Sequence, residues 1–140
     1  MRELNEGDKA PNFNGKDQNG NSISSEDFSD KKLILYFYPK DDTPGCTKEA
    51  CNLRDNYELL MNKGFSIVGV SADNEAKHLK FINKYDLPFS LIADVDKEVI
   101  NAFGCWGPKK FMGKEYDGIH RKTFVIDSGV ITKIFHKVKT

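Results

Sequence analysis

An unbroken apolar segment, residues 32–38 (KLILYFY), constrains the fold more than any other feature of the sequence. A strand with one face in water alternates apolar and polar side chains, and this segment does not alternate. It therefore suits a central strand covered on both faces, ended by Pro39. Residues 65–71 (FSIVGVS) are predicted to form a second buried strand. Two such strands need covering layers on both sides of a sheet.

Helices are the expected covering layers. Apolar residues that recur at intervals of three and four predict helices over residues 46–63, 74–85 and 97–103. The first of these is expected to be continuous and to end at a glycine. The inward residues expected for the second helix are Leu79, Ile82 and Tyr85.

Shorter strands complete the predicted sheet. We expect strands at residues 89–92, 123–126 and 130–135, the last two joined by a tight turn. The dipeptide Asn19-Gly20 between apolar positions predicts an N-terminal β-hairpin. Residues 105–121, rich in Gly and Lys, are expected to form a loop.

This order of elements predicts an α/β fold with a mixed central sheet flanked by helices. A chain of 140 residues is the usual size of one domain, so residues 1–140 are expected to form a single domain.

Composition argues against several classes of partner. Twenty-one basic residues cancel 21 acidic ones, so no global field would attract nucleic acid or an anionic membrane. No segment approaches the roughly 20 apolar residues that span a bilayer, and the first residues lack the apolar core of a secretion signal. Three cysteines in such a chain argue against a disulfide framework and favour a cytoplasmic protein with catalytic thiols.

The segment that links the first buried strand to the first helix is the best candidate for chemistry, because sites on such sheets lie beyond strand carboxyl ends. Cys46 falls in the first turn of the predicted helix, with Thr43 suited to the N-cap and Pro44 to the first helical position. Unpaired N–H groups and the helix dipole there favour thiolate over thiol. The alternative is a small buried cysteine without reactivity.

A second cysteine, Cys51, lies five positions after Cys46. In an intact helix their Cα atoms are about 8.6 Å apart, whereas a disulfide requires less than about 7 Å. Either the two never pair, or the first turn of the helix unwinds to let them. Geometry leaves both alternatives open.

No set of side chains has the spacing of a metal site. His78, His120 and His136 are scattered, and none stands at a zinc-like distance from a cysteine pair. We expect ordinary surface or partly buried histidines, no bound metal, and a bystander role for Cys105. We expect Trp106, Phe111 and Met112 to pack in the core. The alternative is that they form an apolar rim that contacts the organic group of a substrate or a partner protein.

Pro39, Thr43 and Cys46, in the order Pro-x-x-x-Thr-x-x-Cys, resemble the active-site motif of the peroxiredoxins. Residues 45–51 (GCTKEAC) are similar to the Q-type branch, also called bacterioferritin comigratory proteins. The similarity extends over nearly the whole chain. It includes residues 9–13 (KAPNF), 111–114 (FMGK) and 118–127 (GIHRKTFVID).

The resemblance implies a thioredoxin-like fold and a thiol peroxidase for hydrogen peroxide and organic hydroperoxides in antioxidant defence. Cys46 would become a sulfenic acid, and Cys51 would resolve it as an intramolecular disulfide before further oxidation. A thioredoxin or similar dithiol reductant would recycle the enzyme. No cofactor is implied, and a monomer is expected.

The resemblance also implies roles for four further residues. Arg121 would favour the thiolate and polarise the peroxide, the alternative being a surface cation. Thr43 would hydrogen-bond at the thiolate and peroxide, and Pro39 would shield the pocket from water. Glu49 would lie near the pocket, and a solvated helix acid is an equally good account of it.

Three rival functions are considered. A thiol–disulfide oxidoreductase of the same fold would ordinarily need Cys-x-x-Cys, but position 49 is Glu. A redox sensor would use the same cysteines, and only turnover with a reductant separates it from an enzyme. A metal-binding module has only two candidate cysteines.

The resemblance further implies an amphipathic helix over the sheet after residue 140, whose absence would affect stability more than chemistry.

Overall fold

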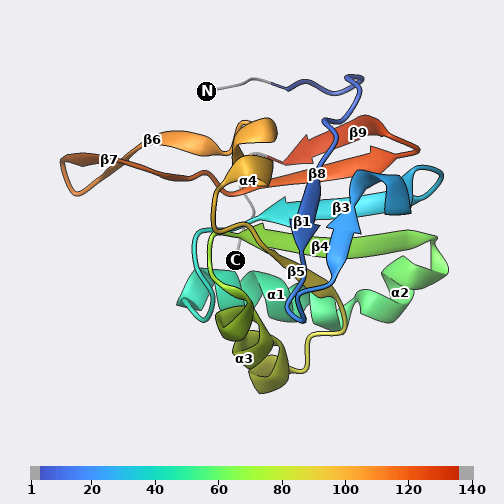
Figure 1. The fold of residues 1–140 in the computed structure, drawn as a ribbon, viewed down its shortest axis with the longest axis horizontal. Helices are drawn as coiled ribbons and strands as arrows, with labels where there is room; N and C mark the ends of the chain where they lie inside the picture. Colours follow the sequence, from blue (N-terminus) through green and yellow to red (C-terminus); the bar gives the residue numbers. More distant parts are fainter. Residues whose placement is uncertain (1–3, 136–140) are drawn as a thin grey trace.

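A computed structural model describes residues 4–135, which form an α/β fold built on a five-stranded mixed sheet (Figure 1). The strand order is β5-β4-β3-β8-β9. Strands β3, β4 and β5 are parallel, and β8 runs antiparallel to both β3 and β9. The bounds are β3 Lys32–Phe37, β4 Phe65–Ser71, β5 Ser90–Ala93, β8 Lys122–Asp127 and β9 Val130–Phe135. The two buried segments expected from the sequence, β3 and β4, are thus confirmed.

Strand β3 shows why its segment has no polar alternation. Leu33, Leu35 and Phe37 belong to one buried apolar cluster, which includes residues of β2 and α4. Ile34 and Tyr36 point to the opposite face, into a cluster shared with α1 and α3. Because successive strand residues face opposite sides, a strand between two cores must be apolar throughout.

The two faces of the sheet have different covers. Helices α1 (Pro44–Asp55), α2 (Tyr57–Asn62) and α3 (Glu75–Tyr85) gather in the lower part of Figure 1. The other core takes side chains from α4 (Glu98–Ala102) and from the N-terminal hairpin of β1 (Asn14–Lys16) and β2 (Ser22–Ser24). A short 3-10 turn, η1 (Ser25–Phe28), follows the hairpin. The hairpin expected around Asn19-Gly20 is confirmed, with Gly20 at φ +80°.

The continuous helix expected over residues 46–63 is wrong. The chain forms α1 and α2, which meet at Asn56, where φ and ψ are −104° and 9°. The Asn56 side chain donates to the carbonyl of Asn52 at 2.8 Å. Asparagine side chains compete in this way for backbone groups and so disfavour helix interiors.

Helix α3 begins as expected, since the Asn74 side chain accepts from the backbone N–H of Lys77 at 2.9 Å. Of the inward residues expected, Ile82 and Tyr85 pack against the buried cluster, whereas Leu79 is 40% exposed. The fully buried residues of the helix are His78 and Phe81. The expectation that His78 is a surface or partly buried histidine is also wrong. A fully buried histidine escapes apolar pattern analysis, because its partners are distant in sequence. His136 lies outside the described residues.

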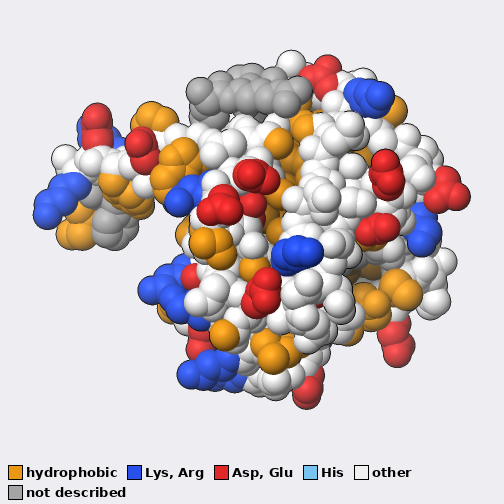
Figure 2. Space-filling model, in the orientation of Figure 1, with side chains coloured by type: hydrophobic (Ala, Val, Ile, Leu, Met, Phe, Trp, Pro, Cys, Tyr) orange, Lys and Arg blue, Asp and Glu red, His pale blue; other side chains and the backbone are white. Residues whose placement is uncertain are grey.

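Residues 105–121 do not form the expected loop. They contain a β-hairpin of β6 (Trp106–Phe111) and β7 (Lys114–Ile119), which projects from the body on the left of Figures 1 and 2. Met112 and Gly113 make its two-residue turn with φ of +53° and +79°, the signs typical of a type I′ turn. Pro108 within β6 weakens the strand pattern, since proline suits only edge positions.

Candidate active site

The segment after β3 leads directly into α1 and places Cys46. Thr43 has an extended backbone at the N-cap, and its carbonyl accepts from Thr47 N–H at 2.8 Å. Pro44 takes the first helical position, as expected, and Cys46 the third. The Cys46 side chain is buried, with 1% of its surface exposed. The helix-start position of this thiol is therefore confirmed.

Arg121 immediately precedes β8 in the sequence. Its side chain bridges two buried polar side chains of α1, those of Cys46 and Glu49. Its Nη2 donates to Cys46 Sγ at 3.1 Å, and its Nη1 donates to Glu49 Oε1 at 2.8 Å. Cys46 and Glu49 are three residues apart, so they share one face of the helix. The structure thus brings together a thiol, a carboxylate and a guanidinium that are up to 75 positions apart in sequence.

Charge at this site is distributed unequally. Burial raises the pKa of Glu49, and the nearby Arg121 only partly opposes this effect. Burial lowers the pKa of Arg121, but Cys46 and Glu49 raise it by more. Burial prevails for the Glu49 pKa because its side chain is 4% exposed and has one cationic partner. The partners prevail for the Arg121 pKa because its side chain is 22% exposed and has two of them. The guanidinium therefore stays charged, with its Nη2 at the Cys46 sulfur.

Thr43 and Pro39 lie beside this group without the contacts expected of them. The Thr43 hydroxyl donates to the Lys40 carbonyl at 3.1 Å. Its side chain caps no N–H of α1. Pro39 is half-buried, two residues after the end of β3. Their roles at the peroxide and in shielding the pocket stay predictions.

Cys51 is half-buried on α1, and both it and Cys46 are free thiols. The helix runs unbroken through both positions, so their Cα atoms are held about 8.6 Å apart. This structure therefore corresponds to a form in which the pair cannot bond.

Cys105 is fully buried, and burial raises its pKa to about 12, with Lys122 opposing only weakly. A thiol of this kind is protonated at neutral pH and has no access to solvent. These properties support the bystander role expected for it.

Two nearby groups escaped the sequence analysis. Lys109 of β6 donates to the Ile119 carbonyl at 2.8 Å; burial and then Arg121 lower its pKa, while Cys46 raises it. Its segment was expected to be a loop, so no strand pattern marked it. The buried Tyr36 hydroxyl has no hydrogen-bond partner among the described residues, and burial, then Glu49, raises its pKa. Within residues 4–135 no group of three His, Cys, Asp or Glu side chains could hold a metal ion.

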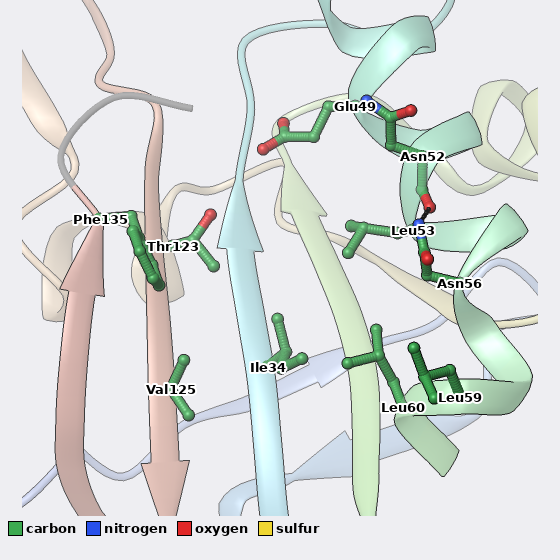
Figure 3. A pocket seen from close by; sticks show the side chains of 10 residues that line it. All are labelled: Ile34, Glu49, Asn52, Leu53, Asn56, Leu59, Leu60, Thr123, Val125 and Phe135. Atoms are coloured by element: carbon green, nitrogen blue, oxygen red, sulfur yellow. Dashed lines mark hydrogen bonds between the residues drawn. The ribbon is translucent and has the colours of Figure 1, made fainter. Parts of the chain in front are cut away.

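An apolar groove of about 490 Å³ begins at Glu49 and runs between α1, α2 and the sheet (Figure 3). Leu53 and Leu60 line its helical side, and Ile34 and Val125 its sheet side. Among the described residues that line it, Glu49 is the one ionisable residue. The groove therefore connects the buried carboxylate of the site to a hydrophobic surface.

Comparison with known proteins places this geometry in context. The family described as AhpC/TSA matches residues 6–134. "Peroxiredoxin Bcp" of Escherichia coli K12 is 46% identical over 141 aligned residues, covering 100% of this chain and 90% of that protein. The structure of a Xylella fastidiosa PrxQ cysteine-to-serine mutant has a TM-score of 0.91 and 28% identity, covering 99% of this chain and 89% of that one. The structure of Xanthomonas campestris bacterioferritin comigratory protein, described with alkyl peroxide reduction activity, has a TM-score of 0.85 and 31% identity, covering 91% and 81%.

Proposed function

The chain belongs to the AhpC/TSA family and is a thiol peroxidase of the peroxiredoxin type with a thioredoxin-like fold, and on that basis we propose that Cys46 is its peroxidatic cysteine. The observation that carries this assignment is the 3.1 Å contact from Arg121 Nη2 to Cys46 Sγ at the start of α1. A fixed cation and a helix N-terminus both favour the thiolate, which is the nucleophilic form.

The proposed first step is attack of the Cys46 thiolate on the distal oxygen of a hydroperoxide. The S–O bond forms as the O–O bond breaks, which leaves a sulfenic acid at Cys46 and releases an alkoxide or hydroxide that takes up a proton. Arg121 would stabilise the negative charge that develops on the oxygens. Glu49 orients the guanidinium through Nη1, leaving Nη2 for the sulfur. Thr43 and Pro39 are proposed to bind the peroxide and to exclude water.

In the second step the Cys51 thiol attacks the sulfur of the Cys46 sulfenic acid. The S–S bond forms and water leaves, giving an intramolecular disulfide that requires α1 to unwind locally. A thioredoxin or similar dithiol then reduces this disulfide by exchange. The balanced reaction consumes one hydroperoxide and one dithiol and yields an alcohol or water, a further water and a disulfide.

The substrates proposed are hydrogen peroxide and organic hydroperoxides, consistent with the alkyl peroxide reduction described for the Xanthomonas campestris protein. We propose a monomer formed of one domain, acting in the cytoplasm without nucleic acid, membrane or cofactor. In the described part of the chain, no helix has the length and apolar character needed to cross a membrane.

Peroxide consumption coupled to a thioredoxin system tests the assignment. Cys46→Ser is expected to abolish turnover, because a serine oxygen is a far poorer nucleophile at neutral pH. Cys105→Ser, a matched replacement of a buried thiol outside the site, is expected to retain turnover. Retained activity in Cys46→Ser would overturn the assignment. Stoichiometric oxidation without turnover in the wild type would favour the redox sensor instead.

A further inference from the structure

A buried polar cluster lies behind the segment that carries the active cysteine. His78 of α3 is 0% exposed, and its Nδ1 lies 2.6 Å from Asp41 Oδ2. Its Nε2 lies 2.9 Å from the carbonyl oxygen of Ile92 in β5. The other oxygen of Asp41 accepts from the Tyr38 hydroxyl at 2.5 Å. Both ring nitrogens of His78 and both oxygens of Asp41 therefore have a partner.

These contacts fix the number of protons in the cluster. A carbonyl oxygen only accepts, so His78 Nε2 must carry a hydrogen. His78 Nδ1 and Asp41 Oδ2 would then both be acceptors at 2.6 Å, unless a proton lies between them. His78 and Asp41 together therefore hold one proton more than a neutral imidazole and an ionised carboxylate would hold. Its net charge is zero, which suits a site shielded from water.

Charged groups of both signs surround the pair on its outer side. Tyr38 approaches from the end of β3, and Asp73, which follows β4, accepts from the backbone N–H of Asp41 at 2.6 Å. Lys77 of α3 lies 3.8 Å from Asp73 and offsets its charge. Strand β5 contributes a carbonyl group without charge. Asp41 also lines a cavity of about 170 Å³, where the carboxylates of Asp42 and Asp73 face four lysines, Lys40, Lys77, Lys80 and Lys84.

The pair connects α3 to the catalytic segment. Asp41 stands two residues before Thr43 and five before Cys46. The next residue, Asp42, has φ of +57°, a strained conformation for a non-glycine residue. The end of α3 also holds Asp42, whose carboxylate accepts from Lys84 Nζ at 2.7 Å and from the Tyr85 hydroxyl at 2.6 Å. The turn that leads into α1 is thus fixed at two successive residues by one helix.

We propose that His78 and Asp41 form a proton-holding anchor that positions Cys46 and Thr43 for attack on the peroxide. The inference rests on the proposed role of Cys46. His78 and Asp41 are positioning residues, since neither contacts the sulfur. Loss of the anchor lets the turn and the first residues of α1 shift relative to Arg121, which is held from β8. Misplacement of reacting groups by about 1 Å is enough to slow a reaction about 100-fold.

Two substitutions at one position separate positioning from bulk stability. In Asp41→Asn, the amide donates to Nδ1 of a neutral His78 and its oxygen accepts from Tyr38, so every hydrogen bond is kept without the extra proton. Its rate of peroxide attack, measured by rapid mixing, is expected within about threefold of wild type. In Asp41→Ala the anchor is lost, and the rate is expected to fall about 10- to 100-fold. Asn83→Ala, on the exposed side of α3, is the matched control and keeps the wild-type rate.

A stability control and a spectroscopic measurement complete the test. Ile131→Ala removes buried apolar contacts on the opposite face of the sheet and is expected to lower stability without slowing peroxide attack. Nitrogen NMR of His78 in the wild type is expected to show a proton on Nε2 throughout the neutral range. A bare Nε2 would overturn the proposal, as would Asp41→Ala reacting as fast as Asp41→Asn or as Ile131→Ala. Retained turnover in Cys46→Ser would instead refute the proposed function and leave the His78 spectrum unchanged.

Discussion

Formation of the Cys46–Cys51 disulfide is expected to unwind part of α1. Amide hydrogen exchange in this helix therefore reports directly on the catalytic cycle. The reduced helix is continuous from Pro44 to Asp55 and holds the two Cα atoms about 8.6 Å apart. A disulfide needs less than about 7 Å. Rotation of side chains alone cannot close this gap, so the backbone between the two cysteines must change.

The contacts of the helix set the size of the effect. Unwinding removes the hydrogen bond from Arg121 to Glu49, a charged contact worth roughly 1.5–3 kcal/mol. It also exposes Cys46 and Ala50, now 1% and 0% exposed, at roughly 0.8 kcal/mol each. The sum of about 3.1–4.6 kcal/mol corresponds to an acceleration of amide exchange of roughly 150- to 2,000-fold.

Hydrogen exchange with mass spectrometry of peptides that cover residues 44–55 measures this acceleration in peroxide-oxidised and reduced protein. Cys51→Ser is the control, because it is expected to form the sulfenic acid without unwinding and to keep slow exchange. It should also accumulate overoxidised Cys46. An oxidised protein with a mapped Cys46–Cys51 bond and unchanged slow exchange would refute the reasoning. A mapped bond from Cys46 to Cys105 would move the resolving role.

Three further predictions concern buried groups. At pH 8 the Cys105 thiol, with its pKa raised to about 12, is expected to be alkylated on the order of 10³-fold more slowly than an exposed thiol of ordinary pKa, as mass spectrometry of iodoacetamide-treated native protein would show. Burial raises the Glu49 pKa, so the wild type loses stability as pH rises from the unfolded-state pKa of this group through its folded-state pKa. Glu49→Gln cannot ionise and is therefore expected to gain stability relative to wild type over that range. Urea titrations from pH 4 to 8 that show a constant difference between the two proteins would contradict this. Gly69→Ala is expected to lower the free energy of unfolding by about 1–3 kcal/mol, because its Cβ would lie 2.7 Å from both Leu91 Cδ2 and Tyr36 Cζ; an unchanged urea midpoint would show that these side chains move aside.

Features that leave a mark on apolar periodicity or at a helix cap could be predicted from the sequence. The apolar run of β3 follows from two cores that meet the strand from opposite sides, and the position of Cys46 in the first turn of α1 follows from Thr43-Pro44. The break at Asn56 has a local cause too, but a side chain that competes for a carbonyl leaves no trace in apolar periodicity. The β6–β7 hairpin was missed because Pro108 and the short Met112-Gly113 turn interrupt the strand pattern.

Features with distant partners could not be predicted from residue patterns. Arg121 entered only through a family resemblance, since nothing near it in the sequence distinguishes it from a surface cation. The burial of His78 could not be predicted from the sequence pattern, because its partner Asp41 is 37 positions away. A polar residue on the inner face of a helix becomes plausible only when the tertiary structure supplies a partner for both of its nitrogens.

The active site also depends on the register of β8 against β3. Lys122 pairs with Phe37 at the last position of β3, so Arg121 comes just beyond the strand pair, next to the segment that carries Cys46. Adjacent strand residues point to opposite faces: Arg121 contacts Cys46 on the α1 side, whereas the Lys122 side chain reaches the Gly104 carbonyl on the α4 side at 3.4 Å. A slip of one residue would exchange the two, bringing a lysine to the thiolate and burying a guanidinium in the other core. Lysine is a point charge without the planar fork that lets Arg121 bind sulfur and carboxylate together. The apolar alternation of β8, with Phe124 and Ile126 in the α4-side core, prevents this slip, so the same residues that stabilise the sheet also determine which cation the cysteine contacts.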